Sequence, residues 1–273
     1  MLNTKKAYAA GKFYISNKKE LLENLDEFKN AHKADYDYCS RAIIVPHAGY
    51  IYSGQLAFDS FCYLNKNVKN IFIFAPTHKK SANNLILAEY DEFETPLGTI
   101  PVNWDIQEEL IQKFKCEYFN EGFEEEHAIE VQLPFIQYLF KNVQIIPILV
   151  GNDDVDKTIE IIEHYYDNTE NAFVISSDLS HFLNETEQQK TDFITAAMIE
   201  SGFVQGFRFE QACGAIPICA LAEHSRRRDF TLIRTGLTNS AKVTGDKNSG
   251  MYPGIFYQLC SKTDNHCEIS TEK

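Results

Sequence analysis

Short, strongly apolar runs alternate along the chain with longer segments whose apolar residues recur at helical spacing. The runs are too short for helices and rich in Val, Ile and Phe, which predicts buried strands. We expect strands at Ala42–Val45, Ile71–Ala75, Leu85–Ala88, Val143–Val150, Ala172–Ser176, Phe230–Leu237 and Gly254–Leu259.

The longer segments have the periodicity of amphipathic helices. In Asn17–Ala31, Leu21 and Leu25 fall on one face, and Asn17 can cap the first turn. Pro134 is expected in the first turns of its helix, or at a kink. Further helices are predicted at Asp105–Phe114, Ala128–Phe140, Asp153–Tyr166, Glu187–Glu200 and Phe209–His224.

Strands that alternate with helices predict an α/β fold with a central, mostly parallel sheet flanked by helices. The segment Asp153–Tyr166 has the length of a crossover helix, so it and the strands on either side form a parallel βαβ unit. We find no linker, repeat or low-complexity tract. We therefore expect one domain over residues 1–273, with an ordered core from about residue 8 to about residue 260 and a frayed tail from Ser261.

Composition and charge exclude several classes of protein. The chain of 273 residues is 44% hydrophobic and 13% aromatic, which supplies a large core and argues against disorder. Its 39 acidic and 26 basic residues give a net charge of −13, which argues against binding to nucleic acid or to an anionic membrane. The sequence has no membrane-spanning segment or secretory signal, and its seven cysteines form no C-x-x-C pair. A reducing cytoplasm is the expected location.

Histidines follow three of the predicted strands closely. His47, His78 and His181 lie in the sequences P-H, P-T-H and S-S-D-L-S-H, each directly after an apolar run. Ligand crevices of open parallel sheets lie beyond the carboxyl ends of the strands, so we expect these imidazoles to converge. Neutral imidazole is the commonest nitrogen ligand of transition metals. The pattern predicts a metal site, with Asp178 as a ligand or as the residue that orients His181.

Four other residues have two interpretations each. His127 follows three acidic residues at the expected start of a helix, where it is either part of a solvated cap or an acid/base residue. Tyr50 and Tyr52 lie in a glycine-containing segment that suits a small polar ligand or simply forms a turn. Cys213 precedes a glycine and is a buried structural thiol or a nucleophile, the former being favoured. The remaining histidines are predicted at the surface: His32, His164, His224 and His266.

Five motifs in order carry a resemblance to a known family. They are P-H-A-G-Y-x-Y-S-G at 46–54, A-P-T-H at 75–78, E-H-x-I-E-x-x-L-P-F at 126–135, S-S-D-x-S-H at 176–181 and C-G at 213–214. Together they resemble the Memo family, whose bacterial and archaeal members are called AmmeMemoRadiSam system protein B. With A-G-K-F-Y at 10–14, the resemblance runs from about residue 8 to about residue 259.

The resemblance implies a fold similar to that of the class III extradiol dioxygenases, which are non-haem iron enzymes. It also implies metal binding, since animal members of the family are described as metal-binding redox proteins with two histidines and a cysteine as ligands. By motif match the histidines are His47 and His78, whereas the position of the cysteine falls at Ala241. We expect His181, Asp178 or His127 to complete the set of ligands.

Our first hypothesis is an enzyme that uses iron, or else copper or zinc, for redox or oxygen-dependent chemistry on an unknown small substrate. It assigns metal binding to His47, His78 and His181, catalysis to His127, Asp178 and His181, and substrate contacts to Tyr50, Tyr52 and Cys213. The alternative is a non-catalytic scaffold that recognises a peptide or small anion, as animal relatives are thought to engage phosphotyrosine peptides. A third hypothesis, from the bacterial name, is an accessory component of a radical-SAM-linked modification pathway.

Overall fold

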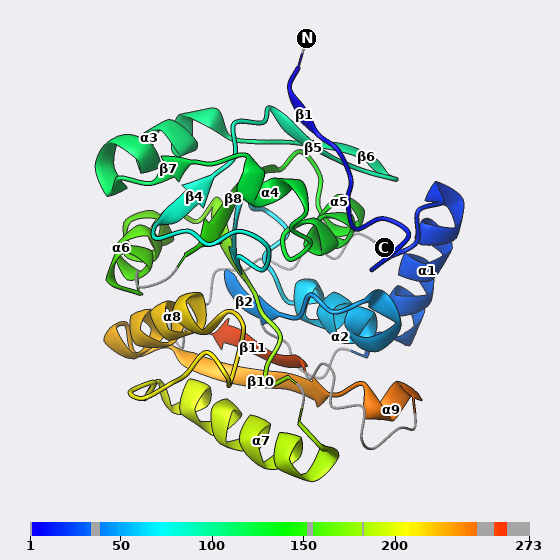
Figure 1. The fold of residues 1–273 in the computed structure, drawn as a ribbon, viewed down its shortest axis with the longest axis vertical. Coiled ribbons are helices and arrows are strands. Elements are labelled where there is room, and N and C mark those ends of the chain that lie inside the picture. The colour runs from blue at the N-terminus through cyan, green and yellow to red at the C-terminus, as the bar shows by residue number, and fades with distance from the viewer. Residues whose placement is uncertain (1, 34–38, 152–154, 182, 245–253, 261–273) are drawn as a thin grey trace.

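The computed structural model describes residues 2–33, 39–151, 155–181, 183–244 and, as backbone, 254–260. Its main feature is an eight-stranded mixed sheet with the strand order β10-β11-β2-β9-β3-β8-β4-β7 (Figure 1). The strands are β2 (Ala42–Val45), β3 (Asn70–Pro76), β4 (Leu85–Leu87), β7 (Glu117–Tyr118), β8 (Gln144–Val150), β9 (Asn171–Ser176), β10 (Thr231–Thr238) and β11 (Gly254–Cys260).

The sheet is parallel at its centre and mixed at its flanks. Strands β2, β9, β3 and β8 are mutually parallel, with Ile43 opposite Val174 and Ile73 opposite Pro147. Antiparallel pairing joins β11 to β2, β10 to β11 and β4 to β8. The expected mostly parallel sheet is therefore present only in the four central strands. Strands β10 and β11 pair antiparallel, an arrangement that needs no crossover helix.

A second, three-stranded sheet lies outside the main one and was not predicted. It consists of β1 (Thr4–Lys5), β5 (Glu92–Thr95) and β6 (Gly98–Pro101), in the order β1-β5-β6. These strands are short and only partly buried, so they lack the apolar runs by which the other strands were recognised.

Helices cover both faces of the main sheet (Figure 1). Their bounds are α1 (Lys18–Ala31), α2 (Tyr50–Cys62), α3 (Trp104–Phe114), α4 (Glu121–Glu124), the 3-10 turn η1 (Glu130–Gln132), α5 (Leu133–Leu139), α6 (Val155–Tyr166), α7 (Glu185–Ser201), α8 (Ala215–Arg227) and α9 (Ala241–Thr244). The predicted cap of α1 is confirmed, because the Asn17 side chain accepts from the backbone N–H groups of Lys19 and Glu20.

Both faces of the central strands are buried, which explains their unbroken apolar sequences. Along β2, Ile43 and Val45 belong to the apolar cluster on one face, and Ala42 and Ile44 to the cluster on the other. The same alternation holds along β3, β8 and β9. Among the described residues, no helix is both long and apolar enough to cross a membrane.

Several predicted bounds need correction. The segment Ala128–Phe140 starts with the 3-10 turn η1, and α5 begins only at Leu133, with Pro134 in its first turn as expected. The helix predicted at Phe209–His224 begins at Ala215. His224 is fully buried rather than at the surface. The tail from Ser261, with His266, lies outside the described residues.

The predicted loop around Tyr50 is wrong, because these residues form the first turns of α2. Gly49 is the residue before the helix. A Cβ atom at Gly54 would lie 2.6 Å from the ring of Phe28, so this glycine permits the close packing of α1 on α2. The glycines therefore shape a helix contact and not a ligand-binding loop.

Candidate metal centre

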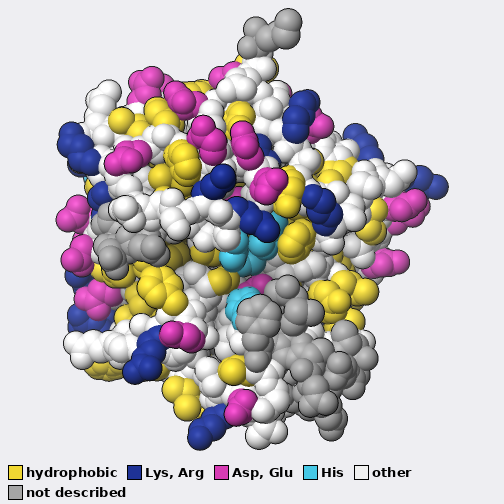
Figure 2. Space-filling model, in the orientation of Figure 1, with side chains coloured by type: hydrophobic (Ala, Val, Ile, Leu, Met, Phe, Trp, Pro, Cys, Tyr) yellow, Lys and Arg dark blue, Asp and Glu magenta, His cyan; other side chains and the backbone are white. Residues whose placement is uncertain are grey.

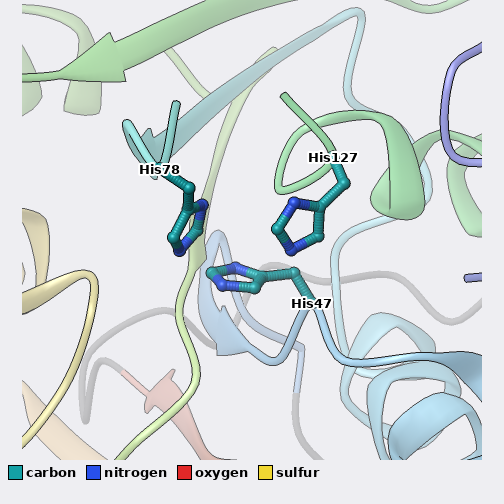
Figure 3. Close-up of side chains that lie close together, drawn as sticks. All are labelled: His47, His78 and His127. Atoms are coloured by element: carbon teal, nitrogen blue, oxygen red, sulfur yellow. The ribbon is translucent and has the colours of Figure 1, made fainter. Parts of the chain in front are cut away.

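Three histidines converge where the chain leaves β2, leaves β3 and approaches η1. The ring centroids of His47 and His78 lie 5.1 Å apart, those of His47 and His127 5.3 Å, and those of His78 and His127 4.9 Å. One potential ligand atom from each ring lies within 4.8 Å of the others. The rings point toward one another from three separate segments (Figure 3). The expected convergence of His47 with His78 is thus present, and His127 is the third member.

The tautomer of His47 follows from the hydrogen bonds around Ser176. The Ser176 hydroxyl donates its proton to the carbonyl oxygen of Ala128 at 2.6 Å. Its oxygen must therefore accept from Nδ1 of His47 at 3.0 Å and from Nε2 of Gln132 at 2.9 Å. Burial, followed by the neighbouring His78 and His127, lowers the pKa of His47 and keeps its ring neutral. His47 hence carries its proton on Nδ1, and its lone pair is on Nε2.

A single buried carboxylate, that of Glu126, determines which nitrogen faces it in the rings of His78 and His127. Oε1 of Glu126 lies 3.0 Å from Nδ1 of His78 and 3.2 Å from Nδ1 of His127. It also accepts from the backbone N–H groups of His127 and Ala128, while Oε2 accepts from the N–H of His78. Burial favours a raised pKa for Glu126, but these hydrogen bonds hold its pKa well below the ordinary value. The ionised carboxylate can only accept, so each Nδ1 carries a proton and each Nε2 is available.

This donor set fits a divalent transition metal. Metal-binding imidazoles usually hold the proton of the second ring nitrogen in a hydrogen bond to a fixed acceptor, which sets the tautomer and the ring orientation. Here all three rings have such an acceptor, on Ser176 or Glu126. Three imidazole ligands suit zinc, copper or iron and leave coordination positions free for another molecule.

A cavity of about 520 Å³ opens beside the three histidines. Histidine side chains reach the surface near the centre of the face shown in Figure 2. One wall is aromatic, because the ring of Phe13 stacks on that of His127 with a centroid distance of 4.1 Å. Other lining residues are Tyr8, Lys79, Asp178, His181, Phe209, Glu210 and Cys213. A small molecule in this cavity would lie directly against the candidate metal ligands.

Asp178 lines the cavity and is almost fully buried. Its Oδ1 accepts from the backbone N–H of His47 at 3.0 Å, and its Oδ2 lies 4.0 Å from Nε2 of the same residue. Burial raises the pKa of Asp178 to about 7, which exceeds the opposing effect of the hydrogen bond from His47. Asp178 can therefore hold or release a proton near neutral pH beside the Nε2 of His47.

His181, the expected third ligand, lines the cavity but is not a member of the group of three converging ligand atoms. Burial, followed by His78, lowers the pKa of His181, so its ring is neutral as well. His127 takes the expected place of His181 beside His47 and His78. It comes from a loop before a helix, which the rule about strand ends does not cover.

Cys213 lines the cavity because the turn that contains it packs closely against the residues that follow β9. Its Sγ lies 3.2 Å from Nε2 of His47 and accepts from the N–H of Asp178 at 3.3 Å. A Cβ atom at Gly214 would come within 2.6 Å of Ser177, so only glycine lets this turn approach the strand so closely. Burial, followed by the nearby Asp178, raises the pKa of the Cys213 thiol. The protonated thiol donates to the lone pair of His47.

The two tyrosines proposed as substrate contacts lie elsewhere. Tyr50 is buried in the core, where its hydroxyl donates to the carbonyl oxygen of Val131 at 2.7 Å and its ring stacks on Phe135. Neither Tyr50 nor Tyr52 lines the cavity beside the histidines. By contrast, Phe13 and Glu126 belong to the site although neither was a candidate. For Glu126 the signal was present, because it directly precedes a histidine within a motif, but its two acidic neighbours suggested a solvated surface.

Comparison with known proteins gives consistent results. A family described as Memo-like protein matches residues 5–251, a span that includes all three converging histidines. A MEMO1 family protein of Thermoplasma acidophilum is 32% identical over 257 residues, covering 89% of this chain and 94% of the relative. A MEMO1 family protein of Methanococcoides burtonii is 30% identical over 263 residues, 90% and 97% of the two chains. One from Aquifex aeolicus is 27% identical over 266 residues, 91% and 97% of the two.

Proposed function

The chain belongs to the Memo family, and on that premise we propose that it is a metal-dependent enzyme that performs redox or oxygen-dependent chemistry on a small molecule. The observation that carries this proposal is the convergence of three imidazoles, each of which offers one ligand nitrogen within 4.8 Å of the other two. Each ring also has a fixed acceptor, on Ser176 or Glu126, behind its second nitrogen, as metal-binding histidines usually do.

Each part of the proposed site has a role that its contacts support. His47, His78 and His127 would hold the metal, and Ser176 and Glu126 keep their tautomers and orientations. When bound, a transition metal supplies Lewis-acid or redox chemistry. We propose iron, copper or zinc, because imidazole suits all three.

The surrounding side chains would control protons and water. Asp178 is the proposed proton carrier, because its carboxyl group titrates near neutral pH and lies 4.0 Å from His47. His181 lines the same cavity and is proposed as a second acid/base residue. The aromatic side chains Phe13, Tyr8 and Phe209 would exclude water from a substrate of the size that a 520 Å³ cavity accepts.

A binding role without turnover is the second candidate. Lys79 lines the cavity together with Glu210, and it forms no ion pair with Glu210 or another described residue, although the chain as a whole is strongly acidic. An unpaired ammonium group at a cavity favours an anionic group on the ligand, such as a phosphate or carboxylate of a peptide. Under this alternative the histidines would contact the ligand directly.

Metal content separates the two candidates. The protein is reconstituted without oxygen with iron, copper or zinc in turn, and retained metal is measured by plasma mass spectrometry. We expect near-stoichiometric metal in the wild type and in His164→Ala, whose imidazole lies on α6 and bonds to Glu109. We expect loss in His47→Ala and His78→Ala. A wild type that folds but retains no metal would overturn the enzyme proposal and favour the binding role.

A further inference from the structure

The N-terminal segment contributes one wall of the site, and a single carboxylate holds it there. The segment runs from β1 toward α1 (Figure 1). Within it a tight turn, with Gly11 at a φ of +79°, closes with a hydrogen bond from the Gly11 N–H to the carbonyl oxygen of Tyr14 at 2.7 Å. The turn presents Phe13, whose ring stacks on His127 at 4.1 Å and 20°. Tyr8 lines the same cavity.

The carboxylate belongs to Glu130, which is 3% exposed and lies in η1, three residues after His127. Its Oε1 accepts from the backbone N–H of Ala9 at 2.7 Å and from the hydroxyl of Tyr14 at 2.8 Å. Its Oε2 accepts from the N–H of Tyr8 at 2.7 Å. These bonds lie on both sides of Phe13 in sequence. They attach this wall to η1, the turn that follows the candidate metal ligand His127.

A further charge and a further backbone contact complete the attachment. The ammonium group of Lys5 lies 3.5 Å from Oε2 of Glu130, with both side chains buried. The carbonyl oxygen of Phe13 accepts from the N–H of Tyr50, which follows His47 by three residues. Hydrogen bonds to a buried carboxylate are among the stronger ones in proteins, and Glu130 has no contact with the cavity itself. Glu130 can therefore affect the site only through the residues that it holds in place.

We propose that Glu130 is a positioning residue of the site: it fastens residues 5–14 so that Phe13 remains stacked on His127 and fixes the plane of that imidazole. Glu126 holds the Nδ1 of His127 but leaves the ring free to tilt about this bond, whereas a stacked phenyl ring resists tilting. The two acids thus restrain different motions of one ring. The inference rests on the proposed function only in treating His127 as a metal ligand.

The test compares Glu130→Gln with Glu125→Gln, which removes the same charge from an exposed side chain in the adjacent segment. In the metal-free protein we expect Glu130→Gln to speed amide hydrogen exchange at Tyr8 and Ala9 by about tenfold or more, because a charge-assisted acceptor is lost. The NMR shifts of the His127 ring protons should also lose the ring-current contribution of Phe13. Glu125→Gln should leave both unchanged.

Copper(II) is the probe for the site. We expect Glu130→Gln to weaken copper binding by roughly tenfold in a competition titration and to alter the electron paramagnetic resonance spectrum. Phe13→Leu should alter the His127 shifts and copper binding in the same way while the amides of Tyr8 and Ala9 stay protected. If Glu130→Gln does not fold, Tyr14→Phe removes only one of the three bonds to Glu130 and should show smaller changes of the same sign.

The outcomes are distinguishable. Unchanged His127 shifts in Glu130→Gln overturn the positioning role. A second outcome also overturns it: Glu130→Gln loses the stacking of Phe13 on His127 but binds copper with the affinity and the spectrum of Glu125→Gln. Glu130 would then be only a structural anchor. A wild type that binds no copper, iron or zinc overturns the proposed function, while the His127 shifts still decide whether Glu130 positions that ring.

Discussion

The sulfur atom of Cys213 lies 3.2 Å from Nε2 of His47, the nitrogen whose lone pair faces the candidate metal position. The thiol is protonated, since burial, followed by Asp178, raises its pKa, and the lone pair at 3.2 Å is a closer acceptor for its proton than the carbonyl oxygen of Asp178 at 3.6 Å. A metal that binds His47 must break this hydrogen bond. The thiol thus competes with the metal for one of its three ligands.

We therefore expect Cys213→Ala to strengthen metal binding. A neutral hydrogen bond contributes about 1 kcal/mol net, so the affinity for zinc should rise by roughly threefold to tenfold. The measurement is a competition titration with a chromophoric chelator. Cys219→Ala, a half-buried thiol on α8 outside the cavity, serves as the control. A weaker affinity in Cys213→Ala would show instead that the sulfur is itself a ligand.

Glu126 supplies the second prediction, because one of its oxygens accepts from the Nδ1 atoms of both His78 and His127. In Glu126→Gln the negative charge is lost and the amide nitrogen competes for the same positions. We expect zinc affinity to fall by about tenfold to a hundredfold, as is typical when the acceptor behind a metal-binding histidine is removed. Glu124→Gln, which changes an exposed acid of the same segment, should bind as the wild type does. Equal affinities in the two variants would contradict the assigned tautomers.

The third prediction distinguishes the structural assignment of ligands from the one based on motif position. His127→Ala should lose most of its retained metal, because it removes one of the three converging nitrogens. His181→Ala should retain metal near the wild-type ratio, since its ring lies in the cavity but outside the group of three. Plasma mass spectrometry after identical reconstitution gives the comparison. Metal loss in His181→Ala with retention in His127→Ala would restore the original assignment.

The central strands could be predicted from sequence because both faces of the sheet are buried. Runs such as Ile71–Ala75 are apolar throughout and bounded by polar residues, which leaves little room for another interpretation. Helix α2 was missed for a local reason. Its glycines resemble turn residues, and only the packing of Phe28 against Gly54 shows why a helix carries one there.

The site could be predicted only in part. His47 and His78 follow strands, and the rule that ligands gather beyond the carboxyl ends of parallel strands predicts that the two rings lie close together, as they do. The same rule put His181 ahead of His127. That choice depends on the path of the chain between β7 and η1, which is a matter of tertiary packing. The role of Glu126 was hidden because charge runs are usually solvated, whereas here one member of the run is buried and the other two are exposed.

The last prediction concerns His224, which belongs to α8 and is fully buried. Its ring lies 4.7 Å from that of Tyr166 and 6.0 Å from that of Phe230. Neither ring nitrogen has a hydrogen-bond partner among the described residues. Burial, followed by the charge of Arg228, lowers the pKa of His224 to about 4. The neutral ring is therefore the form that the folded protein accepts.

Stability should consequently fall as the solution becomes acidic. In the unfolded chain a histidine titrates near pH 6.5, so between about pH 6.5 and pH 4 the unfolded state binds a proton that the folded state does not. The free energy of unfolding then decreases with falling pH in this window, by about 2 kcal/mol at pH 5, and is unaffected above it. In His224→Phe, whose ring fits among the same aromatic neighbours, this contribution is absent. Urea unfolding at pH 7.5 and pH 5 measures the difference, since every other titrating group is common to both proteins. The wild type should lose about 2 kcal/mol more than the variant between the two pH values, and equal losses would mean that His224 accepts a proton without unfolding.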